Sequence, residues 1–255
     1  MGLKLILKTL TRDDGVRIVP KLERHLLKMN WKGNGDGWIH PSGVGYCVKA
    51  QFWNLCQAPF EDKIDPLLRR IFDNGTYFHI RTQKYLLKAG IMLPNPKRKD
   101  GEWQFEDKKH RIHGTADGLI APKGCGSMLE LKSIGDRGYS ILGGPKHEHL
   151  WQTHLYMNGL KQKRTHYIYE NKNSQLMREF VEEFDPEIFN TIWERVLYIN
   201  KCFETLTIPT KWVTSQEGGC SKCKFSNVCS HGDKWIRENK KVLKKLIKTG
   251  VKNGK

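Results

Sequence analysis

The sequence lacks any apolar run long enough to cross a bilayer, which argues against a membrane-spanning protein. It also lacks a recognisable secretory signal, because the short apolar stretch at residues 3–10 is interrupted by Lys4 and Lys8. Without a secretory route, disulfide bonds are the less favoured use of the seven cysteines, and an odd number leaves at least one thiol over. We therefore expect an intracellular, cytoplasmic protein.

Acidic residues are scarce: the sequence has 27 Asp and Glu but 44 Lys and Arg, which gives a net charge of +17. Such an excess indicates a polyanionic partner. Residues 234–255 hold nine Lys or Arg and one acid, Glu238, around an apolar stripe at helical spacing. This pattern predicts a basic helix that docks by its stripe and offers lysines to phosphates, although a solvated tail or a membrane-surface helix has the same pattern.

A nucleotide-binding loop is also missing. The glycine-rich residues 32–37 are not followed by Gly-Lys-Ser/Thr, so we interpret them as a linker and exclude an ATP site there. A helical segment is expected at residues 19–29 before this linker, and no internal repeat is evident. The predicted organisation is a basic N-terminal segment and linker (1–40), a main domain (41–231) and a basic C-terminal helix or tail (232–255).

The most informative pattern lies in residues 112–134. Residues 112–120 and 128–134 have the alternation of strands, and a turn signal at residues 122–124 predicts a hairpin. Side chains alternate along a strand, so Glu130 and Lys132 share a face, and the neighbouring strand can bring Asp117 beside them. Two carboxylates can hold a hard divalent cation, with a lysine close enough to orient or activate water.

A solvated strand face is the ordinary explanation for a glutamate two positions before a lysine. Here Leu129, Leu131 and Ile134 make the strand apolar, so a buried charged pair would be costly unless it were paired or bound to metal. The following helical segment, residues 147–156, places Gln152, Tyr156 and His149 on one face.

The chain resembles the RecB-like branch of the PD-(D/E)xK nuclease superfamily in four motifs that occur in the same order. They are the run from Gly75 to His79, Asp117, the Glu130-Leu131-Lys132 triplet and the Gln152/Tyr156 pair. The resemblance covers roughly residues 40–230. It implies a metal-ligand role for His79, Asp117 and Glu130. Our hypothesis is that these residues hold Mg²⁺ or Mn²⁺ together with the carbonyl of Leu131. The resemblance also implies that Lys132 is catalytic and that Gln152 and Tyr156 orient the DNA or the lysine. One departure is Gln83, which stands one turn after His79 where an acid would add a ligand.

Three cysteines lie close together late in the chain: Cys220, Cys223 and Cys229. Their spacing suggests ligation of a metal or a cluster, and with His231 they could form a structural Zn²⁺ site of the Cys3His type. The segment ending at Cys47 is similar to the entry segment of the iron-sulfur RecB-like nucleases, such as AddB and the CRISPR-associated adaptation exonucleases. That resemblance implies a [4Fe-4S] cluster held by Cys47, Cys220, Cys223 and Cys229, or with Cys56 in place of Cys47.

We expect Cys125 and Cys202 to be buried or incidental thiols. The same is expected of Cys56 unless it replaces Cys47 as a ligand. Further elements are expected as a helix at 62–89 with a break at 74–75, strands at 165–170 and 175–183, and a long helix at 185–206. The predicted fold class is therefore α/β: a restriction-endonuclease-like mixed sheet flanked by helices, with a C-terminal cysteine cluster and basic helix.

The predicted function is that of a metal-dependent DNA exonuclease acting on single strands or duplex ends, in recombination, repair or phage DNA processing. An endonuclease of the same fold and a non-catalytic nucleic-acid-binding module are the alternatives. The expected partner is DNA, with homo-oligomers or recombination and repair proteins as further partners. A phage-encoded protein would work in the host cytoplasm.

Overall fold

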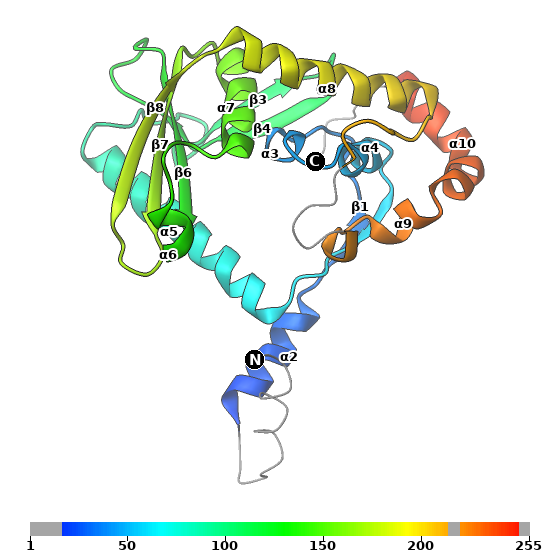
Figure 1. Ribbon diagram of the computed structural model, residues 1–255, viewed down its shortest axis with the longest axis horizontal. Helices are drawn as coiled ribbons and strands as arrows, with labels where there is room; N and C mark the ends of the chain where they lie inside the picture. The colour runs from blue at the N-terminus through cyan, green and yellow to red at the C-terminus, as the bar shows by residue number, and fades with distance from the viewer. Residues whose placement is uncertain (1–16, 214–219, 250–255) are drawn as a thin grey trace.

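The computed structural model describes residues 17–213 and 220–249 (Figure 1). Its helices are α2 (Ile18–Lys28), α3 (Pro41–Val44), α4 (Val48–Leu55), α5 (Pro66–Lys88), α6 (Asp136–Ser140), α7 (His147–Leu160), α8 (Pro186–Thr205), the 3-10 turn η2 (Cys220–Lys222), α9 (Ser226–Ser230) and α10 (Gly232–Thr249). Its strands are β1 (Lys32–Asn34), β2 (Pro59–Glu61), β3 (Trp103–Asp107), β4 (Ile112–Ala116), β5 (Gly118–Leu119), β6 (Ser127–Ile134), β7 (Arg164–Asn171) and β8 (Met177–Glu183).

The central sheet is mixed and has the strand order β5-β6-β7-β8. β6 and β7 are parallel, while β5 and β8 pair antiparallel with them at the two edges. A parallel pair needs a crossover connection, and α6 with α7 supplies it. The α/β class with a mixed sheet flanked by helices is therefore confirmed.

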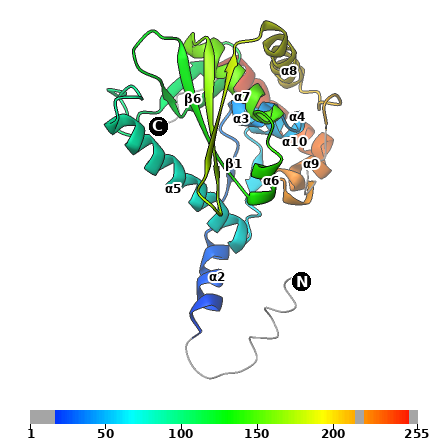
Figure 2. The same ribbon diagram turned by 60° about the vertical axis from the view of Figure 1, so that its left-hand side comes forward.

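Helices cover both faces of this sheet (Figure 2). Leu129 and Leu131 of β6 pack with Phe78 of α5, whereas Met128 packs with Tyr156 of α7. Because alternate strand residues point to opposite faces, α5 and α7 lie on opposite sides of β6. Glu130 is two residues after Met128, so its side chain points to the same face of β6, towards α7.

The predicted strand at residues 112–120 is interrupted at Asp117. β5 forms the expected antiparallel hairpin with β6, but β4 pairs with β3 in a separate two-stranded sheet, with Trp103 opposite Ala116. Asp117 is the residue between the two strands. The interruption arises because β4 pairs with the strand before it, β3, and residue alternation alone does not reveal this pairing.

The predicted break at residues 74–75 is absent, since α5 is one continuous helix. Gly75 costs an exposed helix about 1 kcal/mol relative to Ala. Here a Cβ at Gly75 would meet only the Ser133 hydroxyl, at 3.7 Å, so the glycine sits where the helix passes close to β6. The helix starts with Pro66 after Asp65, whose carboxylate caps the Leu68 N–H at 2.7 Å.

The glycine-rich residues after α2 differ from the expected linker. Lys32–Asn34 form β1 and pair with β2, and Ile39 is fully buried in the main core. At Gly35 a Cβ would stand 2.5 Å from the carbonyl oxygen of Asn54, so only glycine allows this close approach. The helix predicted at 19–29 is confirmed as α2, which projects away from the body (Figure 1).

The largest core joins α4, α8 and α10, and includes Phe52, Trp53, Ile199, Phe203 and Leu243. α8 extends from the sheet to α10 (Figure 1), in agreement with the helix expected at 185–206. The apolar stripe of α10 packs on this core as predicted, while residues 250–255 lie outside the described residues. The strands expected at 165–170 and 175–183 are β7 and β8. Within the described ranges, no helix is both long and apolar enough to cross a membrane.

Candidate active site

Asp117 occupies the interruption between β4 and β5 and is held from three sides. Its Oδ2 accepts the backbone N–H of Leu131 at 2.6 Å, and its carbonyl accepts the Gln83 amide at 2.9 Å. His79 of α5 places Nδ1 3.3 Å from Oδ1. Burial alone would raise the pKa of Asp117, but the His79 hydrogen bond and charge outweigh it, so the pKa is lowered and the carboxylate stays ionised.

His79 is the imidazole partner of this carboxylate. Burial lowers the pKa of its imidazole, and the hydrogen bond and charge of Asp117 more than offset that effect, so the pKa is raised. The structure thus brings together His79 and Asp117, which are 38 positions apart in the sequence.

Glu130 is fully buried on the α7 side of β6. The Lys132 ammonium lies 2.5 Å from its Oε1 as an ion pair. Its other oxygen, Oε2, has no hydrogen-bond partner among the described residues. Burial raises the pKa of Glu130, the Asp117 charge adds to that rise, and Lys132 opposes it. A buried carboxylate with unfilled acceptor positions is costly, and a cation would relieve that cost.

Lys132 is held between the sheet and α7. Its Nζ lies 3.4 Å from the Oε1 of Gln152. Burial lowers the pKa of Lys132, but Glu130 and Asp117 outweigh it, so the pKa is raised and the ammonium is retained. Gln152, which was expected to orient the DNA or the lysine, thus contacts the lysine.

Tyr156 lies one turn beyond Gln152 and is buried against β4. A Cβ at Gly114 would stand 2.7 Å from its ring, so glycine at this position makes room for the tyrosine. Burial raises the pKa of Tyr156, and the charges of Glu130 and Asp117 raise it further. The side chain is therefore a neutral phenol close to the two carboxylates.

His149 lies one turn before Gln152 on α7 and contacts a tyrosine of the sheet. Its Nδ1 lies 2.6 Å from the hydroxyl of Tyr169 on β7. Burial lowers the pKa of His149 to about 3, with the Lys132 and Lys146 charges acting in the same direction. This histidine is neutral at ordinary pH.

Two residues near Asp117 were not included in the sequence-based site. In the sequence, Gln83 stands out only because it replaces an acidic residue that would add a metal ligand. In the structure, its side-chain amide donates a hydrogen bond to the backbone carbonyl of Asp117. Glu102, just before β3, has a pKa raised first by burial and also by the charge of Asp117. Nothing in the spacing around Glu102 indicates this position, because it depends on how the β3–β4 hairpin folds back.

Within residues 17–213 and 220–249, no group of three or more His, Cys, Asp or Glu side chains is arranged to hold a metal ion. His79 pairs with Asp117, and Glu130 pairs with Lys132. The donor types still fit a hard divalent cation: two carboxylates, an imidazole and the backbone carbonyl of Leu131. The buried Oε2 of Glu130, which has no hydrogen-bond partner among the described residues, is the atom that a cation would satisfy.

The cysteines of the predicted cluster come from three places. Cys47 is the residue before α4, Cys220 begins η2 and Cys223 follows it, and Cys229 lies in α9. Burial raises the pKa of Cys223, and the charges of Cys47, Cys229 and Cys220 raise it further. All seven cysteines are free. Cys56 and Cys202 are buried as expected, while Cys125 is half-buried and donates to the Ile120 carbonyl at 3.2 Å.

No protein-family model matches the chain, and no curated protein matches it. Among solved structures it is similar to the alkaline exonuclease LHK-Exo from Laribacter hongkongensis, at 15% identity over 68% of this chain and 90% of that chain, with a TM-score of 0.48. It is also similar to SSO0001, at 15% identity over 88% and 96% of the two chains, with a TM-score of 0.47. A phage-related exonuclease from Haemophilus somnus 129PT covers less, at 12% identity over 50% and 72%, with a TM-score of 0.33.

Proposed function

We propose that the protein is a metal-dependent deoxyribonuclease of the PD-(D/E)xK type. The observation that carries this proposal is the fully buried Glu130, whose Oε1 is paired with Lys132 on the same strand face and whose Oε2 lacks a hydrogen-bond partner among the described residues. An apolar strand retains such a pair at a cost in stability, which is typical of a site that binds a cation and does chemistry.

In this proposal Asp117, Glu130, His79 and the Leu131 carbonyl hold Mg²⁺ or Mn²⁺. The bound cation supplies Lewis acidity at the scissile phosphate and a water of lowered pKa. Asp117 is already fixed by the Leu131 N–H, so its carboxylate is oriented before the cation binds. Lys132 keeps its proton and presents positive charge to the phosphate, and Gln152 holds its ammonium in position.

DNA is the proposed substrate because the chain carries a net charge of +17 and a basic helix, α10. We propose exonuclease action on single strands or duplex ends, in recombination, repair or phage DNA processing. The structures described as exonucleases are consistent with this proposal.

The test uses end-labelled single-stranded DNA, end-labelled duplex and closed circular DNA, with Mg²⁺, Mn²⁺ or EDTA. Lys132→Ala should abolish cleavage, while Lys123→Ala, at the exposed turn of the same hairpin, should retain it. Metal-dependent loss of linear DNA with intact circles supports the exonuclease. Nicked circles would replace it with an endonuclease, and binding without cleavage would replace it with a binding module.

We further propose that Cys47, Cys220, Cys223 and Cys229 hold a [4Fe-4S] cluster. Support comes from Cys223, whose pKa is raised by burial and also by the charges of Cys47, Cys229 and Cys220. Four thiolates suit such a cluster, which would tie α4 to the C-terminal region. The alternative, Zn²⁺ bound by Cys220, Cys223, Cys229 and His231, leaves out Cys47.

Anaerobically purified protein should contain iron and absorb broadly in the visible range. Cys223→Ser and Cys47→Ser should both bleach it, and Cys202→Ser, in the α8 core, should not. Stoichiometric zinc without iron, unaffected by Cys47→Ser but lost in His231→Ala, would replace the cluster with the zinc site.

A further inference from the structure

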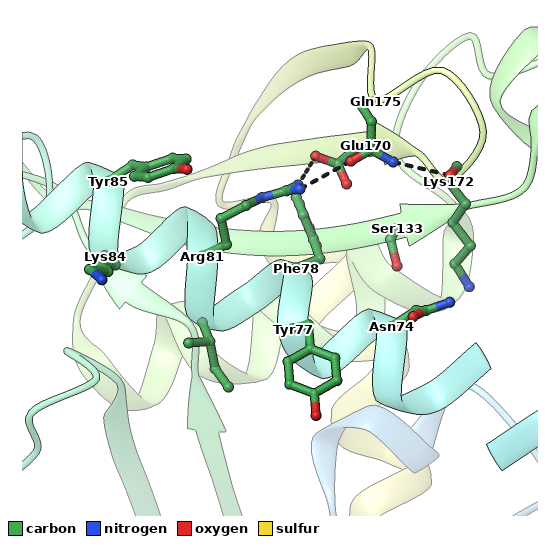
Figure 3. A pocket seen from close by; sticks show the side chains of 11 residues that line it. Asn74, Tyr77, Phe78, Arg81, Lys84, Tyr85, Ser133, Glu170, Lys172 and Gln175 are labelled. Carbon is green, nitrogen blue, oxygen red and sulfur yellow. Dashed lines mark hydrogen bonds and ion pairs between the residues drawn. The ribbon is translucent and has the colours of Figure 1, made fainter. Parts of the chain in front are cut away.

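A groove with a volume of about 570 Å³ lies between α5 and the ends of β6 and β7 (Figure 3). From α5 it is lined by Tyr77, Arg81 and Tyr85, from the sheet by Ser133 and Glu170, and from the turn after β7 by Lys172. None of these residues belongs to the nuclease site described above.

Two aromatic side chains stand on the α5 wall of this groove. Tyr77 and Tyr85 are 68% and 60% exposed, and Arg81 is midway between them in the sequence. Residues four apart share a helix face, so the three form one stripe over two turns, about 12 Å long at 1.5 Å per residue. Large exposed aromatic rings beside a cation are suited to stacking on flat, anionic ligands.

The charge of the groove is mostly positive. Arg81, Lys84 and Lys172 line it, against the single carboxylate Glu170. Glu170 is buried and forms an ion pair with Arg81, which also donates to Gln175 at 3.0 Å. The carboxylate is therefore neutralised within the wall. Burial lowers the pKa of Lys172, so a bound anion would stabilise its charged form.

The groove is built on the same two elements as the proposed nuclease site. The turn of α5 that presents Tyr77 and Arg81 also carries His79, which reaches Asp117. Ser133 directly follows Lys132 on β6. Because alternate strand residues point to opposite faces, Ser133 lies on the α5 side of β6, whereas Glu130 and Lys132 lie on its α7 side. The groove is therefore a contact surface separate from the nuclease site.

We propose that this groove binds a segment of single-stranded DNA, with bases stacked on Tyr77 and Tyr85 and phosphates held by Lys84 and Lys172. The inference rests on the proposed function, which makes DNA the substrate. Aromatic platforms within a positively charged groove are the means by which proteins bind single strands without sequence preference. Duplex bases are already stacked on each other, so they cannot use these rings.

The test measures binding of a fluorescent oligothymidylate to the full-length protein by anisotropy in EDTA, where no cleavage is expected. Tyr77→Ala and Tyr85→Ala should each weaken binding about tenfold. Phe72→Ala is the matched control, because Phe72 is an exposed aromatic residue of α5 outside the groove. Tyr77→Phe and Tyr85→Phe should bind like the unaltered protein, since the ring is kept.

A second arm tests the phosphate contacts. Lys84→Gln and Lys172→Gln should weaken binding and reduce its salt dependence, whereas Lys88→Gln, on the last turn of α5, should change neither. Equal binding by Tyr77→Ala, Tyr85→Ala and Phe72→Ala would overturn the proposal, as would the same losses on duplex and single-stranded DNA. The two proposals can fail separately. If the tyrosine variants lose binding but the unaltered protein never cleaves DNA, the result would support single-strand binding by the groove and reject the nuclease proposal.

Discussion

The side chain of Asp117 and the backbone of Leu131 are joined across the β5–β6 hairpin by a hydrogen bond of 2.6 Å. The carboxylate with the lowered pKa is thus also a structural link between the interruption after β4 and the strand that carries Glu130 and Lys132. Its orientation is fixed by the fold rather than by the His79 contact alone. This double role determines what its substitution should do.

Asp117→Asn removes the charge but keeps an oxygen for the Leu131 N–H. We expect the fold to survive and the pKa of His79 to fall, because burial then acts without the opposing carboxylate. The pKa can be followed in EDTA by the pH dependence of the His79 ring resonances in NMR spectra. In the control, Asp107→Asn, only His110 loses its partner, so the His79 pKa should stay as it was. An unchanged His79 pKa in Asp117→Asn would contradict the assigned cause.

Lys132→Met leaves Glu130 buried without its cation. Removing one partner of a buried ion pair typically costs about 3 to 5 kcal/mol, so we expect a large fall in the free energy of unfolding at neutral pH. Adding Glu130→Gln should recover part of that loss, measured by urea denaturation as a double-mutant cycle. The exposed pair of Lys32 and Glu61 provides the control: Lys32→Met should cost less than about 1 kcal/mol. A similar small cost for Lys132→Met would show that the pair is not buried in solution.

Gly114→Ala places a methyl group 2.7 Å from the Tyr156 ring and 2.9 Å from the Pro41 ring. Tyr156 or β4 must then move, and we expect a loss of about 1 to 3 kcal/mol in stability, as for other overpacked cores. DNA cleavage should fall with it if Tyr156 has the proposed orienting role. Gly143→Ala, where no heavy atom lies within 4 Å, should leave both quantities unchanged. Thermal unfolding and initial cleavage rates provide the two measurements.

His149 should make the fold sensitive to mild acid. Its pKa is about 3 in the folded protein and near 6.5 when unfolded, so the unfolded chain binds more protons between these values. This contribution to stability is complete above pH 6.5 and is lost as the pH falls towards 3. At about pH 5 the loss reaches at most about 2 kcal/mol, less any screening by solvent at this half-buried ring.

The measurement for this last prediction is urea denaturation at about pH 7.5 and about pH 5. His149→Gln should lose less stability between the two pH values than the unaltered protein. His25→Gln, in the projecting helix α2, should show the same pH dependence as the unaltered protein. If His149→Gln also shows the same pH dependence of stability as the unaltered protein, the lowered pKa of His149 is wrong.

Local features of the sequence determined much of the site. The two-residue period of a strand puts Glu130 and Lys132 on one face, and the helical period puts Gln152 and Tyr156 together on α7. Asp65-Pro66 and Asp185-Pro186 are starting signals for α5 and α8 that act within a few residues of the chain. These relationships depend only on neighbouring residues, so they were predictable.

Contacts between distant segments decided the rest. The partner of β4 is β3, so the expected long strand ends at Asp117, and the same hairpin brings Glu102 into the electrostatic neighbourhood of Asp117. The groove exists only because α5 packs beside the ends of β6 and β7, far along the chain from Tyr77 and Tyr85. Residue periodicity specifies which face of an element is buried, but the choice of the element that covers it depends on the free energy of the whole packed structure.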